Sequence, residues 1–254
     1  MSHPDALSRP QVMKVFVIGA TGVLGREAVP QLRAAGHEVG VLDRHTTSLF
    51  DVDQLTAAFT GYDAVLNLAT RIPLSAKAVL ASAWAENNRL RTEGSAAVAE
   101  AATRAGVGRV VQEGISFVYA DGGDRELDES APLRPVGHIA SSVAAQQNVL
   151  KHPGGVFLRI GMLIGGDAQS PPVLVGDGWM SVVHPADAAA AVIAVLDAPP
   201  GIYNVGTPVL KRDTGITRLP NFMGRLAASF EVFGRSQRVV STKLTETTGW
   251  KPRH

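Results

Sequence analysis

The chain has 254 residues, of which 45% are hydrophobic and 19% charged, so it is long enough to bury a large core and is not a disordered protein. Its 24 basic and 23 acidic side chains leave a formal charge of +1, which disfavours nucleic acid or an anionic membrane as a partner. The absence of cysteine excludes disulfides, a thiolate nucleophile and cysteine-ligated metal, so redox chemistry would need a bound cofactor.

Neither the start of the chain nor its apolar stretches predict a membrane segment. Residues 1–11 are polar, contain proline and lack an apolar run, which predicts a frayed leader rather than a signal peptide. The most continuous apolar stretch, Ala188–Leu196, has about nine residues, and roughly 20 are needed to cross a bilayer. We therefore expect a soluble, cytoplasmic protein.

Short runs rich in Val, Ile and Leu alternate with helix-like segments along the chain. The predicted strands are 12–18, 38–42, 64–68, 109–112, 156–160 and 202–205. The predicted helices are 26–35, 55–59, 75–105, 141–150 and one that begins at 183–187. This alternation predicts an α/β fold, a doubly wound parallel sheet of the Rossmann type with helices on both faces.

The composition changes after residue 160, where glycine and proline become frequent. We expect a dinucleotide-binding domain over residues 12–160 and a small C-terminal substrate-side subdomain over residues 161–254, with residues 184–205 returning to the first domain. In a doubly wound sheet, the ligand crevice lies beyond the carboxyl ends of the strands. The candidate site residues should therefore follow the strands.

A glycine turn follows the first predicted strand directly and precedes the first predicted helix. In this context, glycines allow the backbone to turn tightly and to approach a diphosphate, while the helix N-terminus offers free N–H groups to the phosphates. The turn is therefore a candidate dinucleotide site. Its residues are Gly19, Thr21, Gly22, Val23, Leu24 and Gly25.

The residues after the next strand bear on which dinucleotide binds. Asp43, eighteen residues after Gly25, is placed to accept hydrogen bonds from the adenosine ribose of NAD. Arg44 beside it keeps NADP open, because a guanidinium can pair with the 2′-phosphate. Asp51 is suited to receive the adenine amino group, with Val52 next to it. NAD is the expected cofactor and NADP the alternative.

Taken together, these residues resemble the extended short-chain dehydrogenase/reductase family, which includes UDP-sugar epimerases and nucleotide-sugar dehydratases. The resemblance runs over most of the chain and includes Thr248–Pro252, similar to the family's C-terminal signature. It implies that Leu68, Ala69 and Thr70 face the nicotinamide half of the cofactor. It further implies an oxidoreductase or epimerase acting on a sugar-like or polyketide-like small molecule, and a possible homodimer.

The family's acid/base couple is missing. Its chemistry uses a Tyr and, four residues later, a Lys that lowers the pKa of the Tyr. The three tyrosines of this chain are followed at the fourth position by Leu, Gly and Thr, so no such couple exists. His138 stands where the Tyr belongs and Ser142 where the Lys belongs. The candidate catalytic residues are therefore His138, Tyr119 and Ser116.

Loss of the couple leaves other functions open. One is a non-redox isomerase or cyclase in a repurposed cofactor pocket, and another is a non-catalytic NAD(P) sensor. The spacing of the seven histidines predicts no metal site. For the basic segment 211–254, the resemblance implies that Arg225 or Arg235 holds a substrate pyrophosphate; the alternative is a solvated surface that offsets the acidic loop.

Overall fold

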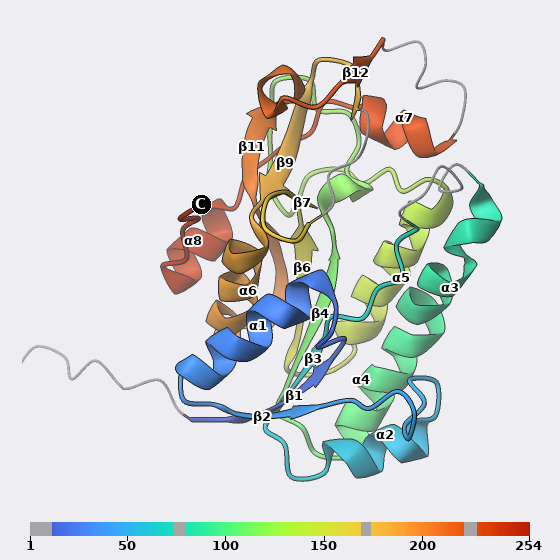
Figure 1. Ribbon diagram of the computed structural model, residues 1–254, viewed down its shortest axis with the longest axis vertical. Helices are drawn as coiled ribbons and strands as arrows, with labels where there is room; N and C mark the ends of the chain where they lie inside the picture. The colour runs from blue at the N-terminus through green and yellow to red at the C-terminus, as the bar shows by residue number, and fades with distance from the viewer. Residues whose placement is uncertain (1–11, 74–79, 169–173, 221–227) are drawn as a thin grey trace, which may run out of the picture.

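The computed structural model describes residues 12–73, 80–168, 174–220 and 228–254, so the predicted leader lies outside the described residues. A six-stranded sheet with the order β10-β6-β4-β3-β1-β2 forms its centre (Figure 1). Every pairing in this sheet is parallel, which confirms the predicted doubly wound architecture. The strands are β1 (Lys14–Ile18), β2 (Glu38–Val41), β3 (Ala64–Asn67), β4 (Arg109–Ile115), β6 (Gly155–Ile160) and β10 (Gly201–Val205).

The direction of winding reverses at β1. From β1 the chain passes outward to β2 and then returns to β3 on the other side of β1, with Ile18 in register with Asn67. The carboxyl ends of β1 and β3 are therefore neighbours, and a crevice at this switch point is where such sheets bind ligands. All four residues of β3 are buried, because helices cover both faces of the sheet.

Helices form a layer on each side of the sheet (Figure 1). On one side, Leu24 and Ala28 of α1 (Val23–Ala34) share a hydrophobic cluster with Ala188 and Val192 of α6 (Pro185–Ala194). The other layer consists of α2 (Val52–Phe59), α4 (Ser95–Arg104) and α5 (Ala140–Val149). No helix in the described ranges is long and apolar enough to cross a membrane.

The segment predicted as one helix over 75–105 is helical from residue 81 onward, and residues 75–79 lie outside the described part. It consists of a 3-10 turn (Ala81–Trp84), α3 (Ala85–Arg89), a π-helical turn (Leu90–Gly94) and α4. A π-helical turn shifts the register of the side chains around the helix axis and is frequent at functional sites. The hydrophobic pattern contained no sign of this irregularity.

A smaller lobe follows the carboxyl ends of β6 and β10. Its three-stranded sheet has the order β11-β9-β7 (Thr207–Leu210, Trp179–Val183 and Met162–Leu163). Two further pairs are β8 (Leu174–Val175) with β12 (Arg218–Leu219) and β5 (Glu126–Leu127) with β13 (Arg238–Val239). The remaining elements are α7 (Ala228–Gly234), α8 (Thr242–Thr248) and 3-10 turns at Ser116–Val118, Gly137–Ile139 and Lys211–Thr214.

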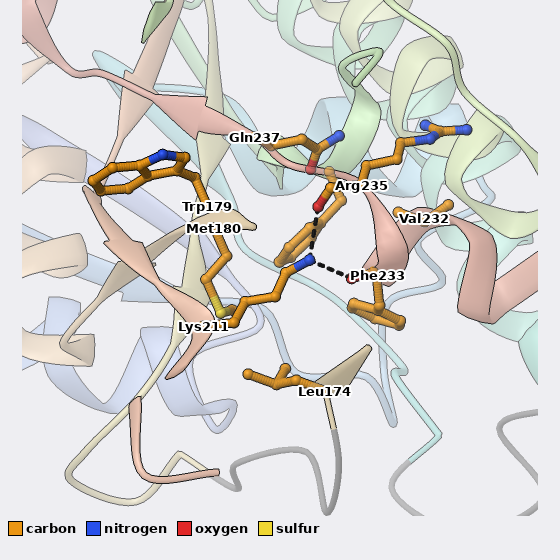
Figure 2. Close-up of a pocket in the computed structure, with 9 residues that line it drawn as sticks. Leu174, Trp179, Met180, Lys211, Val232, Phe233, Arg235 and Gln237 are labelled. Carbon is orange, nitrogen blue, oxygen red and sulfur yellow. Dashed lines mark hydrogen bonds between the residues drawn. The ribbon is translucent and has the colours of Figure 1, made fainter. Parts of the chain in front are cut away.

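A buried lysine joins three segments of this lobe. The Nζ atom of Lys211 donates hydrogen bonds to the backbone carbonyls of Val175, Phe233 and Arg235 at 3.0, 2.7 and 2.7 Å. Figure 2 shows this ammonium pointing toward the carbonyls of Phe233 and Arg235 across a small, largely apolar pocket. Burial lowers the pKa of Lys211 from 10.5 to about 8, although the charge of Asp121 acts in the opposite direction.

Candidate functional site

Two of the three glycines in the turn after β1 are required by packing. Gly19 has φ +83°, and a Cβ atom there would lie 2.7 Å from the backbone of Leu68 at the end of β3. A Cβ atom on Gly25 would lie 2.2 Å from the carbonyl oxygen of Gly19. These distances are shorter than van der Waals contact, so the turn, β3 and α1 pack closely only with glycine at both positions.

Gly22 has a different role, because its conformation suits any residue. Its φ of −73° and ψ of 171° are ordinary extended values, and the nearest atom to an added Cβ would be the Gly19 oxygen at 3.3 Å. Gly22 begins α1, whose N-terminus has no side-chain cap and no acidic residue in its first turn. The amides and the helix dipole at this end favour an anion, and the missing Cβ of Gly22 leaves room for a phosphate. The turn therefore fits a dinucleotide diphosphate.

The residues predicted for the nicotinamide side lie next to this turn. Leu68 is buried against Gly19, and the amide of Ala69 donates to Oδ1 of Asn67 at 3.4 Å. Thr70 is exposed. The structure thus brings the ends of β1 and β3 together, although the contact of Leu68, Ala69 and Thr70 with a cofactor stays a prediction.

Asp43 and Arg44 lie exposed beyond the end of β2. The Oδ1 atom of Asp43 accepts a hydrogen bond from the amide of His45 at 2.9 Å, and its carbonyl accepts from the amides of Thr46 and Thr47. These bonds fix the turn and leave Oδ2 of Asp43 available. The position agrees with a ribose-binding carboxylate, and the choice between NAD and NADP stays a prediction.

Asp51 has a structural role that the sequence analysis missed. It is the N-cap of α2, where Oδ1 accepts from the amides of Asp53 and Gln54 at 3.0 Å and Oδ2 accepts from the Gln54 side chain at 2.9 Å. The pattern Asp-x-x-Gln before an apolar helix is a capping signature, and it was the available signal. Contact of Asp51 and Val52 with an adenine stays a prediction.

His138 lies on the 3-10 turn that leads into α5. Its ring stacks on the indole of Trp84, with 3.6 Å between ring centroids and 12° between planes. Burial, assisted by the positive charge of Arg91, lowers the pKa of His138 from 6.5 to about 4. The imidazole is therefore neutral at pH 7. Its Nε2 atom is buried without a hydrogen-bond partner.

The hydroxyl at the position of the missing Lys is also buried. Ser142 lies one helical turn after His138, has no exposed surface, and its Oγ accepts from the amide of Ile115 at 3.3 Å. This bond ties the start of α5 to the end of β4. Ser116, in the next turn of the chain, is 1% exposed, and its catalytic role stays a prediction.

Tyr119 is a core residue in the structure. Tyr119 has 0% exposed surface. Its hydroxyl donates to Oδ1 of Asn204 at 2.7 Å and accepts from Arg159 at 2.6 Å. Burial raises the pKa of Tyr119, so the phenol stays protonated at neutral pH. Tyr119 thus joins β6 to β10 inside the core, and its catalytic role stays a prediction.

Arg235 is likewise structural. It is 5% exposed, and its Nη1 donates to the carbonyls of Tyr119 and Arg134 at 3.1 and 2.6 Å, while Nη2 pairs with Glu231 at 3.0 Å. This buried guanidinium uses three of its five N–H donors inside the protein, which disfavours contact with a substrate pyrophosphate. The other candidate, Arg225, lies outside the described residues.

The sequence analysis did not single out a buried ion pair beside His138. Arg91, in the π-helical turn, is 2% exposed, and its Nη2 lies 3.0 Å from Oε1 of Glu113 in β4. Burial raises the pKa of Glu113 while Arg91 lowers it. Asn87, one turn before Arg91, has no exposed surface and accepts the amide of Arg71 at 3.0 Å. No local pattern signalled this pair, because its two partners are 22 positions apart in the chain.

Comparison with known proteins gives consistent results. The sequence model described as "NAD dependent epimerase/dehydratase family" matches residues 15–162. A Streptomyces protein named 3-diazoavenalumate denitrifying reductase is 32% identical over 223 residues, which cover 73% of each chain. The spore coat polysaccharide biosynthesis protein SpsK of Bacillus subtilis (strain 168) is 25% identical over 275 residues, covering 95% of this chain and 93% of its own.

Solved structures show the same fold. The UDP-glucose 4-epimerase of Thermus thermophilus, crystallised in complex with NAD, superimposes with a TM-score of 0.75 at 21% identity, covering 95% of this chain and 94% of its own. The dTDP-glucose 4,6-dehydratase DesIV of Streptomyces venezuelae, also with NAD bound, gives a TM-score of 0.75 at 20% identity, covering 95% and 92%.

Proposed function

Since this chain belongs to the NAD dependent epimerase/dehydratase family, we propose that it is a dinucleotide-dependent reductase whose substrate accepts a hydride without a proton from the protein. The observation that carries this proposal is the chemistry of the side chains at positions 138 and 142. There the chain has an imidazole that is neutral at pH 7 and a buried hydroxyl in place of the Tyr and Lys of the resemblance.

The residues of the glycine turn would hold the cofactor. Gly22 and the uncapped N-terminus of α1 would bind the diphosphate, and Asp43 the adenosine ribose. Leu68, Ala69 and Thr70 would line the nicotinamide side. When bound, NADH or NADPH supplies a hydride. The fit of the turn to a diphosphate rests on the absence of a Cβ atom at Gly22, where an added Cβ would meet only the Gly19 oxygen, at 3.3 Å.

The chemistry of the acceptor follows from the missing acid. Reduction of a ketone produces an alkoxide, which needs a proton donor close to the oxygen. His138 is not an imidazolium at pH 7, because its pKa is about 4, so it lacks the acidic proton that a general acid would transfer. An acceptor whose reduction produces no alkoxide avoids this requirement.

A carbon that bears a diazonium group is such an acceptor. The hydride forms a C–H bond, the C–N bond breaks, and N2 leaves with the electron pair of that bond, so no proton is consumed. The name of the Streptomyces relative, a denitrifying reductase of a diazo compound, supports this class of substrate. We propose an acceptor of this kind in preference to a sugar nucleotide.

The proposal is tested by following NADH and NADPH at 340 nm with two substrates, a 4-acetylbenzene diazonium salt and UDP-glucuronic acid, the latter also with NAD in the oxidative direction. We expect dinucleotide oxidation and N2 release with the diazonium salt only. The Gly22→Ala variant is the control, because it should fold but bind dinucleotide at least tenfold more weakly. A mixture without protein measures the uncatalysed reduction of the diazonium salt. Gly25→Ala, by contrast, should fail to fold.

Two outcomes would overturn the proposal. One is the absence of calorimetric heat with both dinucleotides in the folded wild type. The other is turnover of UDP-glucuronic acid with no turnover of the diazonium salt above the rate without protein.

A further inference from the structure

The helix before α4 presents one polar and aromatic face to the start of α5. Trp84 ends the 3-10 turn, Asn87 lies in α3, and Arg91 lies in the π-helical turn. Trp84 stacks on His138, and Arg91 reaches Glu113 in β4. These contacts place the face at the carboxyl end of β4, beside the position of the missing Tyr. We name Trp84, Asn87, Arg91 and His138 the recess.

Unpartnered buried polar atoms concentrate in the recess. Six buried side-chain nitrogen and oxygen atoms in the described ranges lack a hydrogen-bond partner. Three of them are Nδ2 of Asn87, Nε of Arg91 and Nε2 of His138, and a fourth is Oδ1 of the adjacent Asn88. Because an unpaired buried polar group is costly, such a concentration indicates a partner that the protein itself does not provide.

The chemistry of these atoms defines the partner. The Asn87 amide and the Arg91 Nε are donors only, and a neutral imidazole donates from one nitrogen. Glu113 balances the charge of Arg91, so the recess has no surplus positive charge for a phosphate or a carboxylate. The fitting group is an uncharged oxygen, such as a carbonyl, which accepts more than one hydrogen bond. The stacking of the Trp84 indole on His138 shows that a planar aromatic ring fits against this imidazole.

We propose that the recess binds the substrate of the reductase, and that this substrate is a planar aromatic compound whose uncharged oxygen accepts hydrogen bonds from Asn87, Arg91 and His138. The aromatic ring replaces the Trp84 indole on His138, which uncovers the buried Nε2 atom. This inference rests on the proposed function for the identity of the reaction, but binding in the recess is measured separately.

The test uses two ketones that differ only in the ring. Acetophenone and cyclohexyl methyl ketone carry the same carbonyl, and only the first is planar. Calorimetry with the wild-type protein, with and without dinucleotide, should give a Kd for acetophenone at least tenfold lower than for cyclohexyl methyl ketone. Tryptophan emission should change on acetophenone binding and not in the Trp84→Leu variant.

Two conservative variants probe the donors. His138→Phe keeps a ring against Trp84 but removes Nε2, and Arg91→Lys keeps the charge beside Glu113 but removes Nε. Each should weaken acetophenone binding at least fivefold and change the dinucleotide Kd by less than twofold. Equal binding of the two ketones overturns the inference, as does wild-type affinity in both variants. Absence of ketone binding, with the donors satisfied by ordered water only, also overturns it. Loss of dinucleotide binding alone affects the proposed function and not the recess.

Discussion

Burial determines the chemistry of His138 more than its residue type does. In water an imidazole titrates near 6.5, at the centre of the physiological range. In this protein the indole of Trp84 covers the ring, and Arg91 adds a like charge, so protonation is disfavoured. A residue that the sequence offers as an acid or base at neutral pH is therefore a neutral hydrogen-bonding group.

The depressed pKa of His138 predicts an acid-sensitive stability. Between pH 6.5 and about 4 the unfolded chain binds a proton at this residue and the folded protein does not. The free energy of unfolding should therefore fall as the pH drops through this window. Urea unfolding at pH 7 and pH 5 should show a smaller loss in His138→Phe than in the wild type. Equal losses in the two proteins would contradict the assigned pKa, which NMR titration of the ring would measure directly.

At the scale of helices and strands, capping residues determine where helices begin, and hydrophobic periodicity does not predict these boundaries. The predicted helix over 55–59 begins at Val52, because the carboxylate of Asp51 satisfies the first amides of α2. The predicted helix over 26–35 begins at Val23, directly after Gly22. Both helix N-termini lie next to candidate cofactor residues. The same local geometry therefore begins the helix and positions the proposed site.

The capping role of Asp51 gives a stability prediction. Asp51→Ala removes the acceptors of three hydrogen bonds and should lower the free energy of unfolding by about 1 kcal/mol. Asp51→Asn should lose less, because Asn is also a good N-cap. Asp53→Ala is the matched control, since its highly exposed carboxylate only pairs with Arg104 and should contribute well below 1 kcal/mol. A loss in Asp53→Ala as large as in Asp51→Ala would argue against the cap.

Across the molecule as a whole, buried cations hold the smaller lobe together. Lys211 binds carbonyls from β8 and from the end of α7, and Arg235 binds carbonyls of Tyr119 and Arg134. These partners are far apart in the sequence and come from different layers. The basic segment 211–254 was a candidate substrate-binding surface, but two of its charged side chains, Lys211 and Arg235, are buried.

Replacement of Lys211 by Met should destabilise the protein by about 1–3 kcal/mol, because three buried carbonyls lose their donor. Between pH 8 and 10.5 the unfolded chain binds the Lys211 proton more strongly than the folded protein. Wild-type stability should therefore rise in this window relative to Lys211→Met, by no more than about 3 kcal/mol. Urea unfolding of both proteins at pH 7.5 and pH 10 measures the difference. If the difference in free energy of unfolding between the wild type and Lys211→Met became smaller with increasing pH, the lowered pKa of Lys211 would be contradicted.

Local patterns in the chain were enough to establish the alternation of strands and helices, the glycine turn and the absence of a Tyr–Lys couple. Each of these depends on neighbours within a few residues, through side-chain periodicity or the lack of a Cβ atom. The folded structure was needed to show that Tyr119 and Arg235 are core residues, that Arg91 pairs with Glu113 and that His138 is neutral. These properties come from contacts between residues distant in the chain, such as Tyr119 with Asn204, 85 positions apart. Burial and pairing are set by what the fold brings together, and no local pattern records them.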